Sequence, residues 1–376
     1  MDFAFTEEQT MLLDTTRRFI EREYDFETRR RIAAAEPGIS ESAWKTLAEL
    51  GLLALLIPED DGGLGAGPVE TLLVMTALGE GLVVEPYLPS AVLATSAIAR
   101  LGNAAQRAEW LAPMGAGELI AALAHDEPAT RDDPLAVDAR ASRVGSGYLL
   151  SGRKAVVYGA PHAGLLLVSA QLDGEGLALF AVRRDTPGLR LSSYPTFDGH
   201  RAADVHLDNV HVPATARLGA DGADVAAELA AVLDLGLAAL CAEATGVIDR
   251  ALATTIEYAR TRKQFGQPIG KFQALQHRMA DMQIHREQAL SMAYLAAVRA
   301  ADTDARARAT ALSAAKVVIG EACRFVGQQA VQIHGGMGVT DELDVSHQFK
   351  RLFAIEKLFG STLTHLARFG RLRNAA

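Results

Sequence analysis

The sequence contains little cysteine, little tryptophan and fewer basic than acidic side chains. Its 376 residues include two cysteines, two tryptophans, 37 basic and 46 acidic side chains, with a formal net charge of −9. Two cysteines, Cys241 and Cys323, are too few for a disulfide framework or a four-thiolate metal site, and they fit a reducing cytoplasm. The negative charge argues against general nucleic-acid binding, although a local basic patch can still hold a phosphorylated ligand.

Features that direct a chain to a membrane are also scarce. The first eight residues, MDFAFTEE, are acidic where a signal peptide would be basic. No apolar run approaches the roughly 20 residues needed to span a bilayer. The sequence therefore predicts a cytoplasmic protein without a membrane span.

The apolar content is sufficient for more than one core. With 49% hydrophobic and 22% charged residues the composition is globular, and 376 residues exceed one ordinary core. Thr6 and Gln9 form a capping-box pattern ahead of a first helix. Helices are expected from residue 7 into the thirties and at about 42–53, 67–80, 89–101 and 104–115. Apolar runs near 120–123, 148–158, 165–168, 177–182 and 203–212 alternate with turn residues and predict strands.

From residue 221 onward the pattern is helical again. Long helices are expected near 223–261, 272–301, 304–334 and 342–373, which together make a four-helix bundle. The predicted fold is therefore a multidomain α+β protein. Its parts are an N-terminal helical domain (1–118), a small β barrel or sandwich (119–221) and a C-terminal four-helix bundle (222–376).

Two glycine-rich breaks interrupt the helices of this bundle. The first, YARTRKQFGQPIGKFQA at 258–274, has glycine or proline at three of the five positions 266–270, which stops a helix. Three cations precede it, Arg260, Arg262 and Lys263. Alone, these cations could equally be a basic helix C-cap, because the last carbonyls of a helix attract positive charge. The second break, QIHGGMG, covers 332–338.

Together the two breaks resemble signatures of the acyl-CoA dehydrogenase family, Tyr-Ala-x-x-Arg-x-x-Phe-Gly-x-x-Ile and Gln-x-His-Gly-Gly-x-Gly. The resemblance covers essentially the whole chain and keeps the family's order of segments. It implies an FAD-dependent oxidoreductase of lipid metabolism and fatty acid β-oxidation. A carboxylate takes the Cα proton of an acyl-CoA thioester, the flavin accepts hydride from Cβ, and an electron-transfer flavoprotein receives the electrons. The resemblance also implies a homo- or hetero-tetramer.

The resemblance assigns cofactor contacts in both breaks. Arg262 matches the arginine that reaches the pyrophosphate of FAD bound to a neighbouring subunit, a task suited to a planar guanidinium. Gly335 and Gly336 match contacts to the adenosine half, and a backbone without Cβ can approach a phosphate closely. The alternative is that these two glycines only end a helix. The remaining positions implied in the breaks are Gln264, Phe265, Gln273 and Gln332.

The segments that face the flavin ring depart from the family pattern. Where the family has Leu-Thr-Glu-Pro-Gly-x-Gly-Ser-Asp, residues 125–133 read HDEPATRDD, so Asp126 replaces the threonine that contacts the flavin. Where the family has Trp-Ile-Thr-Asn-Gly, this chain has Val156 in place of the tryptophan and Tyr158 in place of the threonine. FAD is still expected, in an altered ring environment.

The general base is missing from both of its usual positions. Phe359, before Gly360, replaces the catalytic glutamate, and the alternative base position falls on Gly236. Two other acids lie on that helix. Asp234 is about 200° around the helix from Gly236 and is the candidate for a displaced base.

Glu243 lies seven residues beyond Gly236 and about 10 Å along the helix axis. Its neighbours are apolar, so it requires a partner and is expected to be a buried hydrogen-bond acceptor. In the segment of the missing base, Ser361 replaces a threonine that contacts the adenosine half, and Leu363 replaces a glutamine.

Within the family, DLGLAALCAEA (234–244) and VSHQFKRL (345–352) look most like the pimeloyl-CoA dehydrogenase small-subunit branch, whose members often pair with a different chain.

Three interpretations of the function remain open. The chain is an FAD-dependent acyl-CoA dehydrogenase with a relocated base, or a non-catalytic subunit that completes FAD sites in a hetero-oligomer. The third interpretation is a flavin-free acyl-CoA-binding or scaffolding protein.

Overall fold

The computed structural model describes residues 5–130 and 133–374 and divides into two compact units. The helical unit comprises Met1–Arg30, Pro68–Val83 and Leu237–Ala376, and the mixed unit comprises Arg31–Gly67 and Val84–Gly236. The chain therefore contributes three separate segments to the helical unit.

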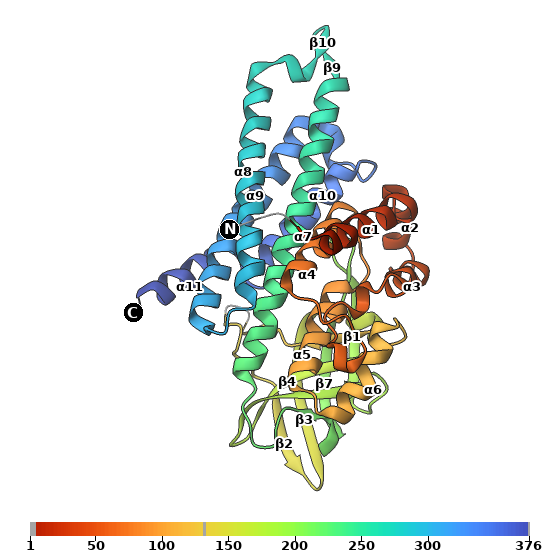
Figure 1. Ribbon diagram of the computed structural model, residues 1–376, viewed down its shortest axis with the longest axis vertical. Coiled ribbons are helices and arrows are strands. Elements are labelled where there is room, and N and C mark those ends of the chain that lie inside the picture. Colours follow the sequence, from red (N-terminus) through yellow and green to blue (C-terminus); the bar gives the residue numbers. More distant parts are fainter. Residues whose placement is uncertain (1–4, 131–132, 375–376) are drawn as a thin grey trace. The chain divides into compact units, whose positions relative to one another are not determined.

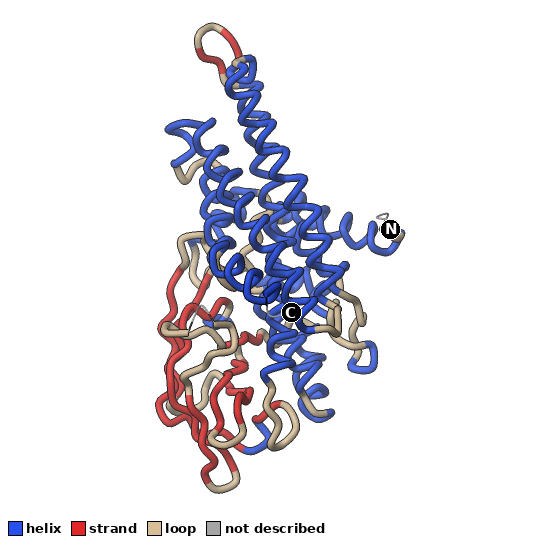
Figure 2. The backbone as a smooth tube through the Cα atoms, turned by 90° about the vertical axis from the view of Figure 1, so that its left-hand side faces the viewer, coloured by secondary structure: helices blue, strands red, loops and turns tan. Residues whose placement is uncertain are grey.

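The helical unit consists mainly of long helices that run alongside one another (Figures 1 and 2). Two helices, α2 and α7, are shared with the mixed unit, and only the part of α7 from Leu237 onward belongs to the helical unit. The elements of the helical unit are α1 (Glu7–Glu23), α2 (Phe26–Ala34), α4 (Pro68–Glu80), α7 (Ala226–Thr261), β9 (Lys263–Gln264), β10 (Gln267–Pro268), η6 (Ile269–Lys271), α8 (Gln273–Ala300), α9 (Ala305–His334), η7 (Gly335–Val339), α10 (Asp344–Lys357) and α11 (Thr362–Asn374).

The mixed unit combines short helices with one eight-stranded sheet. Its strand order is β6-β7-β3-β2-β4-β5-β8, and β1 pairs in parallel with β4. The strands are β1 (Ala121–Ala124), β2 (Arg140–Val144), β3 (Gly147–Tyr158), β4 (Leu165–Leu172), β5 (Gly176–Arg183), β6 (Leu189–Pro195), β7 (Arg201–Pro213) and β8 (Arg217–Leu218). The helical segments are α3 (Glu41–Glu49), η1 (Leu52–Ala54), η2 (Glu59–Asp61), η3 (Tyr87–Ala94), α5 (Thr95–Leu101), α6 (Ala104–Gly115), η4 (Ala160–His162) and η5 (Ala214–Ala216).

These elements confirm the predicted fold class: a helical N-terminal region, a β domain in the middle and a C-terminal helical bundle. Two of the longer strands, β2 and β6, were missed, as were the two-residue strands β8, β9 and β10. The exposed, charged sequence of β2 (RASRV) and the largely exposed β6 (LRLSSYP) lack the apolar run that the other strands show. Exposed strands carry a weak apolar signal.

Two helix predictions were too long. The Thr6–Gln9 capping box forms as predicted, with the Gln9 N–H donating to Thr6 Oγ1 at 3.1 Å. α1 nevertheless ends at Glu23, and the Asp25 carboxylate accepts the Thr28 N–H at 2.8 Å, which begins α2. The expected helix at 342–373 is also two helices, α10 and α11, separated at residues 358–361.

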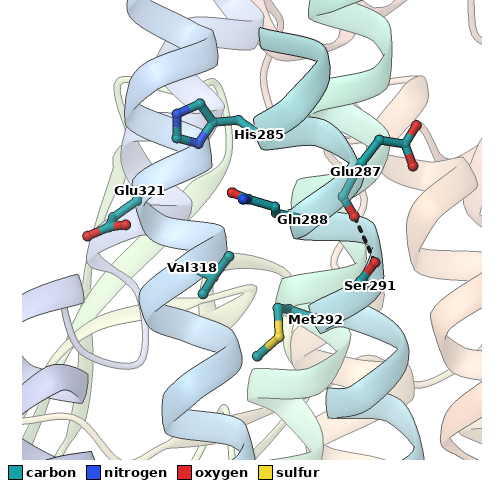
Figure 3. A pocket seen from close by; sticks show the side chains of 7 residues that line it. All are labelled: His285, Glu287, Gln288, Ser291, Met292, Val318 and Glu321. Carbon is teal, nitrogen blue, oxygen red and sulfur yellow. Dashed lines mark hydrogen bonds between the residues drawn. The ribbon is translucent and has the colours of Figure 1, made fainter. Parts of the chain in front are cut away.

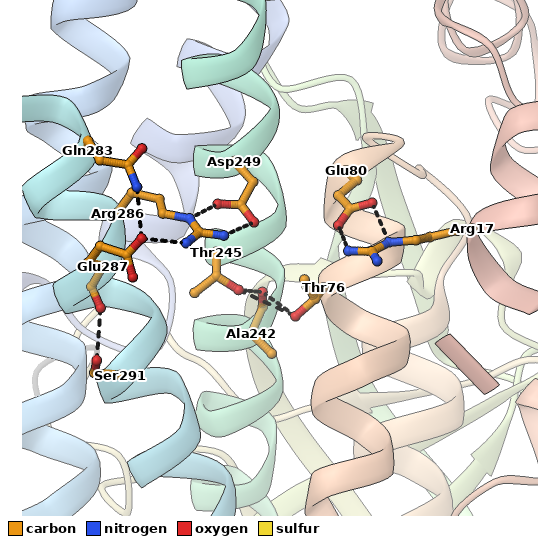
Figure 4. Close-up of polar contacts among 10 residues, drawn as sticks. All are labelled: Arg17, Thr76, Glu80, Ala242, Thr245, Asp249, Gln283, Arg286, Glu287 and Ser291. Atoms are coloured by element: carbon orange, nitrogen blue, oxygen red, sulfur yellow. Dashed lines mark hydrogen bonds and ion pairs between the residues drawn. The ribbon is translucent and has the colours of Figure 1, made fainter. Parts of the chain in front are cut away.

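In the helical unit α4 crosses α7 at unusually close range (Figure 4). Added Cβ atoms at Gly79 and Gly246 would lie 2.3 Å from the Glu243 carbonyl oxygen and 1.9 Å from the Thr76 carbonyl oxygen. Thr76 Oγ1 also donates to the Ala242 carbonyl at 3.3 Å. The crossing therefore requires glycine on both helices, and it buries the middle of α4.

By length and composition α7 would qualify as a membrane span. An 18-residue window within it has a mean hydropathy of 1.7, so the expectation that no apolar stretch approaches that length was wrong for this helix. However, 89% of the window is buried inside the protein, as in a core helix. No other helix in the described residues passes the same test.

Candidate functional site

Backbone strain is concentrated on the segments that the sequence assigns to the site. Among the described residues, five that are not glycine have positive φ: Leu82, Val156, Asn209, Phe265 and Phe359. Three of the five lie on predicted flavin or base segments, with φ of 53° at Val156, 55° at Phe265 and 58° at Phe359. Bulky residues rarely adopt such angles, and those that do are often at functional sites.

The first break forms a hairpin at the end of the α7–α8 pair (Figure 1). Gln264 pairs with Gln267 across a two-residue turn, and Phe265 and Gly266 both have positive φ, as a tight hairpin turn requires. The Phe265 side chain is 91% exposed. Within the described residues the side chains of Arg262 and Gln264 are exposed and make no hydrogen bond or ion pair. The hairpin therefore presents a cation, an amide and an aromatic ring to whatever approaches it.

The second break opens directly after α9. Gly335 has φ 63° and ψ −141°, a conformation that essentially only glycine adopts. A Cβ at Gly335 or Gly336 would meet no atom within 4 Å, so contacts within the described residues do not explain why residue 336 is a glycine. Nearby Gln332 is exposed, with no side-chain hydrogen bond among the described residues. This open backbone suits close approach by a phosphate-bearing ligand.

A stacked ring pair joins the two breaks. Tyr258 and His334 stack with ring centroids 4.2 Å apart, and the Tyr258 hydroxyl donates to the His334 carbonyl at 3.4 Å. The Arg262 N–H donates to the Tyr258 carbonyl at 2.8 Å, so Arg262 lies one helical turn beyond the stack. His334 Nδ1 donates to the Ala330 carbonyl, and burial lowers the pKa of His334, which keeps the ring neutral.

The sequence did not single out this stack, although its two residues occupy fixed places in the two signatures. Gln273 is the first residue of α8 and is exposed, and no side-chain contact ties it to the second break within the described residues. The structure thus places Arg262 one helical turn from the Tyr258–His334 stack, and Gly335 directly follows His334.

The turn at Phe359, where the resemblance places the general base, is held by buried side chains. Phe359 has φ 58° and Gly360 has φ 100°. His365, 2% exposed, donates from Nε2 to the Phe359 carbonyl at 2.8 Å, and its Nδ1 faces Ser313 Oγ at 3.3 Å. Burial lowers the pKa of His365 to about 4, so the ring is neutral near pH 7.

Two further buried groups hold the same turn. The Lys316 ammonium, 1% exposed, donates to the last carbonyls of α10 at Ile355 and Glu356, and burial lowers its pKa. One Glu356 oxygen accepts the Thr362 N–H at 3.1 Å. None of these contacts involves the side chain of residue 359.

Ser361, predicted to contact the adenosine half, has a structural role in this turn. Its Oγ accepts the Thr364 N–H at 3.2 Å and pairs with Thr364 Oγ1 at 3.0 Å, which caps the start of α11. The sequence contains the cue, a serine ahead of a helix, but it was interpreted only through the resemblance.

The buried acids of the helical unit are engaged. Both Glu243 oxygens accept from Arg351, at 2.6 and 2.8 Å, and Glu243 is 6% exposed. The expected partner of Glu243 is therefore an arginine on α10. Glu356, which the sequence did not single out, is shared between the Thr362 N–H and Lys357, 2.7 Å away. Burial opposes ionisation of Glu356, but Lys357 and the Thr362 N–H outweigh it and lower the pKa of that carboxyl.

In the mixed unit, Asp234 lies in the N-terminal part of α7 with 4% exposure. Gly236, at the alternative base position that the resemblance predicts, follows two residues later on the same helix. Asp234 is thus a buried carboxylate, and Gly236 offers no side chain to accept a proton.

The two flavin-ring segments meet in the mixed unit. The Ala155 N–H donates to the Asp126 carbonyl at 2.8 Å, which joins the loop after β1 to the end of β3. The Asp126 side chain is exposed, and Tyr158 is half-buried, edge-on to His200 at 5.9 Å. Residues 131–132 of the same motif lie outside the described residues.

A buried polar cluster fixes the loop that carries Asp126. Lys154, 0% exposed, donates to Glu127 at 2.6 Å and to Ser169 at 2.9 Å. Glu127 also accepts the N–H groups of Asp138 and Ala139. Burial lowers the pKa of Lys154 to about 8. Burial opposes ionisation of Glu127, but Lys154 and the two amides outweigh it and lower the pKa of the carboxyl.

The Glu127-Pro128 pair kept from the family pattern is thus explained by packing of the loop. Nothing in the sequence singled out Lys154, since a lysine in a strand is usually solvated.

A groove on the helical unit contains none of the predicted site residues. It lies between α8 and α9, has a volume of about 450 Å³ and is lined by His285, Glu287, Gln288, Ser291, Met292, Val318 and Glu321 (Figure 3). It is a shallow surface depression without a buried polar group that points to a ligand.

Comparison with known proteins gives a consistent result. The acyl-CoA dehydrogenase N-terminal, middle and C-terminal domains match residues 6–118, 122–210 and 221–371. The chain is similar to acyl-CoA dehydrogenase FadE27 of Mycobacterium tuberculosis, with 32% identity over 377 residues covering 99% of this chain and 98% of that protein.

Two solved structures are similar along the whole chain. The ChsE4-ChsE5 complex from Mycobacterium tuberculosis contains a chain 31% identical, with a TM-score of 0.90 and coverage of 100% of both chains. PigA with FAD and proline is 26% identical, with a TM-score of 0.90 and the same coverage.

Proposed function

Because the chain belongs to the acyl-CoA dehydrogenase family, we propose that it acts in FAD-dependent α,β-dehydrogenation of an acyl-CoA thioester as a subunit without its own base. A second, different chain of the family supplies the carboxylate in a hetero-oligomer, and an electron-transfer flavoprotein receives the electrons. Proteins of this family are oxidoreductases that act on CH–CH groups and bind FAD.

The main support for this proposal is the pair of glycine-rich breaks in the helical unit, which the Tyr258–His334 stack joins. Within the described residues Arg262 has an unengaged guanidinium one helical turn from the Tyr258–His334 stack, and Gly335 and Gly336 expose their backbone beyond it. A planar cation beside an open backbone fits a pyrophosphate. FAD, when bound, supplies the hydride acceptor.

The other proposed contacts follow from position. Gln264 and Phe265 pack beside the pyrophosphate, Gln273 and Gln332 contact the dinucleotide, Ser361 lies at the adenosine half, and Asp126 and Tyr158 face the flavin ring. A related solved structure, PigA, contains FAD by its title, which supports the cofactor.

The lack of a carboxylate at either base position implied by the resemblance supports the hetero-oligomer. Phe359 cannot accept a proton, Gly236 has no side chain, and Glu243 and Glu356 are already paired. Loss of a general base lowers the rate by about a hundred- to ten-thousandfold. By its title, the structure of 31% identity is a complex of two proteins, ChsE4 and ChsE5.

A homo-oligomeric enzyme is the second candidate. It rests on Asp234, a carboxylate with 4% exposure on the helix of the alternative base position. In this case Asp234 would take the Cα proton.

The decisive experiment compares the chain alone with the chain co-expressed with a family member that has the catalytic glutamate. We expect a yellow complex whose flavin absorption bleaches on anaerobic mixing with acyl-CoA thioesters, and no bleaching by the chain alone. Full activity of the chain alone, lost in Asp234→Asn, would establish the second candidate. A colourless protein in both preparations would leave a flavin-free acyl-CoA-binding protein.

A further inference from the structure

Strand β3 contains a strained bulge beside the predicted flavin-ring segment. Lys154 pairs with Val205 and Val157 pairs with Ala203, so β3 advances three residues while β7 advances two. The extra residue makes a β-bulge, a feature common next to functional sites. Val156 lies within it with φ 53° and is 42% exposed. A β-branched residue at such an angle is strained and must be held by its surroundings.

The bulge decides which side chains of β3 face the core. Side chains alternate along a strand, so with Lys154 buried a regular strand would bury Val156 and Tyr158 and expose Val157. In the structure Val157 is 4% exposed, whereas Val156 is exposed and Tyr158 is half-buried. One extra residue moves each later side chain of a strand to the opposite face. The bulge is therefore what turns Val156 and Tyr158 outward.

Two backbone N–H groups leave the strand ladder at the bulge, and each has another acceptor. The Ala155 N–H donates to the Asp126 carbonyl at 2.8 Å. The Val156 N–H donates to Asp204 Oδ1 on β7 at 3.2 Å. Of these two residues, only the strained Val156 thus depends on a side chain for its backbone hydrogen bond.

Asp204 is itself firmly held. The Tyr194 hydroxyl donates to the same Oδ1 at 2.9 Å, and Arg153 pairs with Oδ2 at 2.5 Å. The side chain is 17% exposed. Burial opposes ionisation, but Arg153, the Val156 N–H and Tyr194 together lower the pKa of Asp204. The acceptor is therefore a fixed carboxylate.

We propose that Asp204 is a positioning residue for the flavin site: its carboxylate holds the Val156 bulge and thereby presents Val156 and Tyr158 to the isoalloxazine ring. Asp204 does not touch the ring and acts through β3. This inference rests on the proposed function, since the ring contact of residues 156–158 belongs to it.

The experiment compares Asp204→Ala and Asp204→Asn in the protein as purified, with its partner chain when one is required. The control is Asp208→Ala, an exposed acid on the same strand, outside the bulge. Hydrogen–deuterium exchange by mass spectrometry follows the peptide that spans residues 153–158. The FAD dissociation constant and the visible spectrum of the bound flavin are measured on the same samples.

In Asp204→Ala we expect exchange at 153–158 to rise about ten- to a hundredfold, the range expected for loss of a hydrogen bond to a charged group. We expect a shifted flavin spectrum and about tenfold weaker FAD binding. Asp204→Asn should retain most of the protection from exchange and most of the FAD affinity, because an amide oxygen still accepts from the Val156 N–H. The control should match wild type in every readout.

Unchanged exchange in Asp204→Ala would show that Asp204 does not hold the Val156 bulge. Raised exchange with an unchanged flavin spectrum and unchanged FAD affinity would show that Asp204 does not position the flavin site. If Asp204→Ala does not fold, Asp204→Asn decides: it must fold with a small spectral shift, and failure to fold or an unchanged spectrum would contradict the proposal. Absence of FAD from wild type and its complex would refute the proposed function, and the exchange measurement would still decide whether Asp204 holds the bulge.

Discussion

The helical unit contains two turns in which a phenylalanine adopts a positive φ, and they are held differently. At Phe265 the ring is 91% exposed and the neighbouring Arg262 and Gln264 side chains make no polar contact within the described residues. At Phe359 three buried side chains, Lys316, Glu356 and His365, bind the backbone around the turn. Strained backbone persists where its surroundings fix it. The second turn is fixed by buried side chains, whereas among the described residues the first is held by the pairing of its own hairpin.

This contrast separates binding from chemistry. The hairpin has the features of a surface completed by a ligand or another subunit. The contacts that hold the turn at Phe359 are made to backbone atoms, so they do not depend on which side chain residue 359 carries. Substitutions in the two turns test the contrast, and they are ordered here from the largest expected effect to the smallest.

Arg262→Ala should lower FAD affinity by about a hundred- to a thousandfold, because it removes charge-assisted hydrogen bonds to a pyrophosphate. The unfolding free energy should change by less than about 0.5 kcal/mol, since the side chain is exposed. Flavin fluorescence titration and urea unfolding measure the two effects. Arg260→Ala, on the same helical turn, is the control, and equal losses in both variants would mean a diffuse electrostatic effect.

His365→Ala should lower the unfolding free energy by about 3 kcal/mol, because it leaves a cavity and an unpaired Phe359 carbonyl. Urea denaturation measures this loss. His277→Ala, at an exposed position on α8, provides the control. A loss no larger than the control's would show that the turn stands without His365.

Acid should weaken the same turn. Burial lowers the pKa of His365 from 6.5 to about 4, so the unfolded chain binds a proton at a higher pH than the folded one. The stability from neutral His365 is complete above pH 6.5 and is lost as pH falls toward 4, by about 2 kcal/mol between pH 7 and 5.

His365→Gln isolates this contribution, because the amide can donate to the Phe359 carbonyl and does not titrate. His162, whose pKa burial also lowers to about 4, titrates in both proteins. Parallel urea-midpoint curves for the two proteins across this pH range would rule out the role assigned to His365.

Phe265→Ala should change the unfolding free energy by no more than about 0.5 kcal/mol, since the ring is almost entirely in solvent. FAD affinity should still fall measurably. A loss of stability comparable to that of His365→Ala would show that the Phe265 side chain fixes the hairpin, and the contrast between the turns would disappear.

The sequence was a good guide to periodic elements and to residues within signatures. The Thr6–Gln9 cap, the strands near 165–182 and the three longest helices were readable because each is a local pattern. The break between α10 and α11 was missed although Gly360 and Ser361 are local cues for it, and only Lys316, 43 residues from Phe359 in the chain, is a distant support that the sequence could not indicate.

The candidate site shows the same division. Arg262, Gly335 and Gly336 were identified by resemblance, but the Tyr258–His334 stack that joins them is a contact over 76 residues of sequence. Lys154 and Asp204 look like ordinary strand residues until their partners are known. Local spacing carries no information about which distant group completes a buried charge.

The glycine crossing between α4 and α7 has a consequence for how the chain is made. α4 lies in the segment 68–83, and although α1 precedes it in the chain, the part of α7 that it crosses in the helical unit begins at residue 237. On the ribosome α4 emerges long before the helix that covers it, so its apolar middle waits exposed while more than 150 residues are added. The last-synthesised third of the protein is thus the part that shelters one of its earliest helices, and a truncated nascent chain would be a client for chaperones.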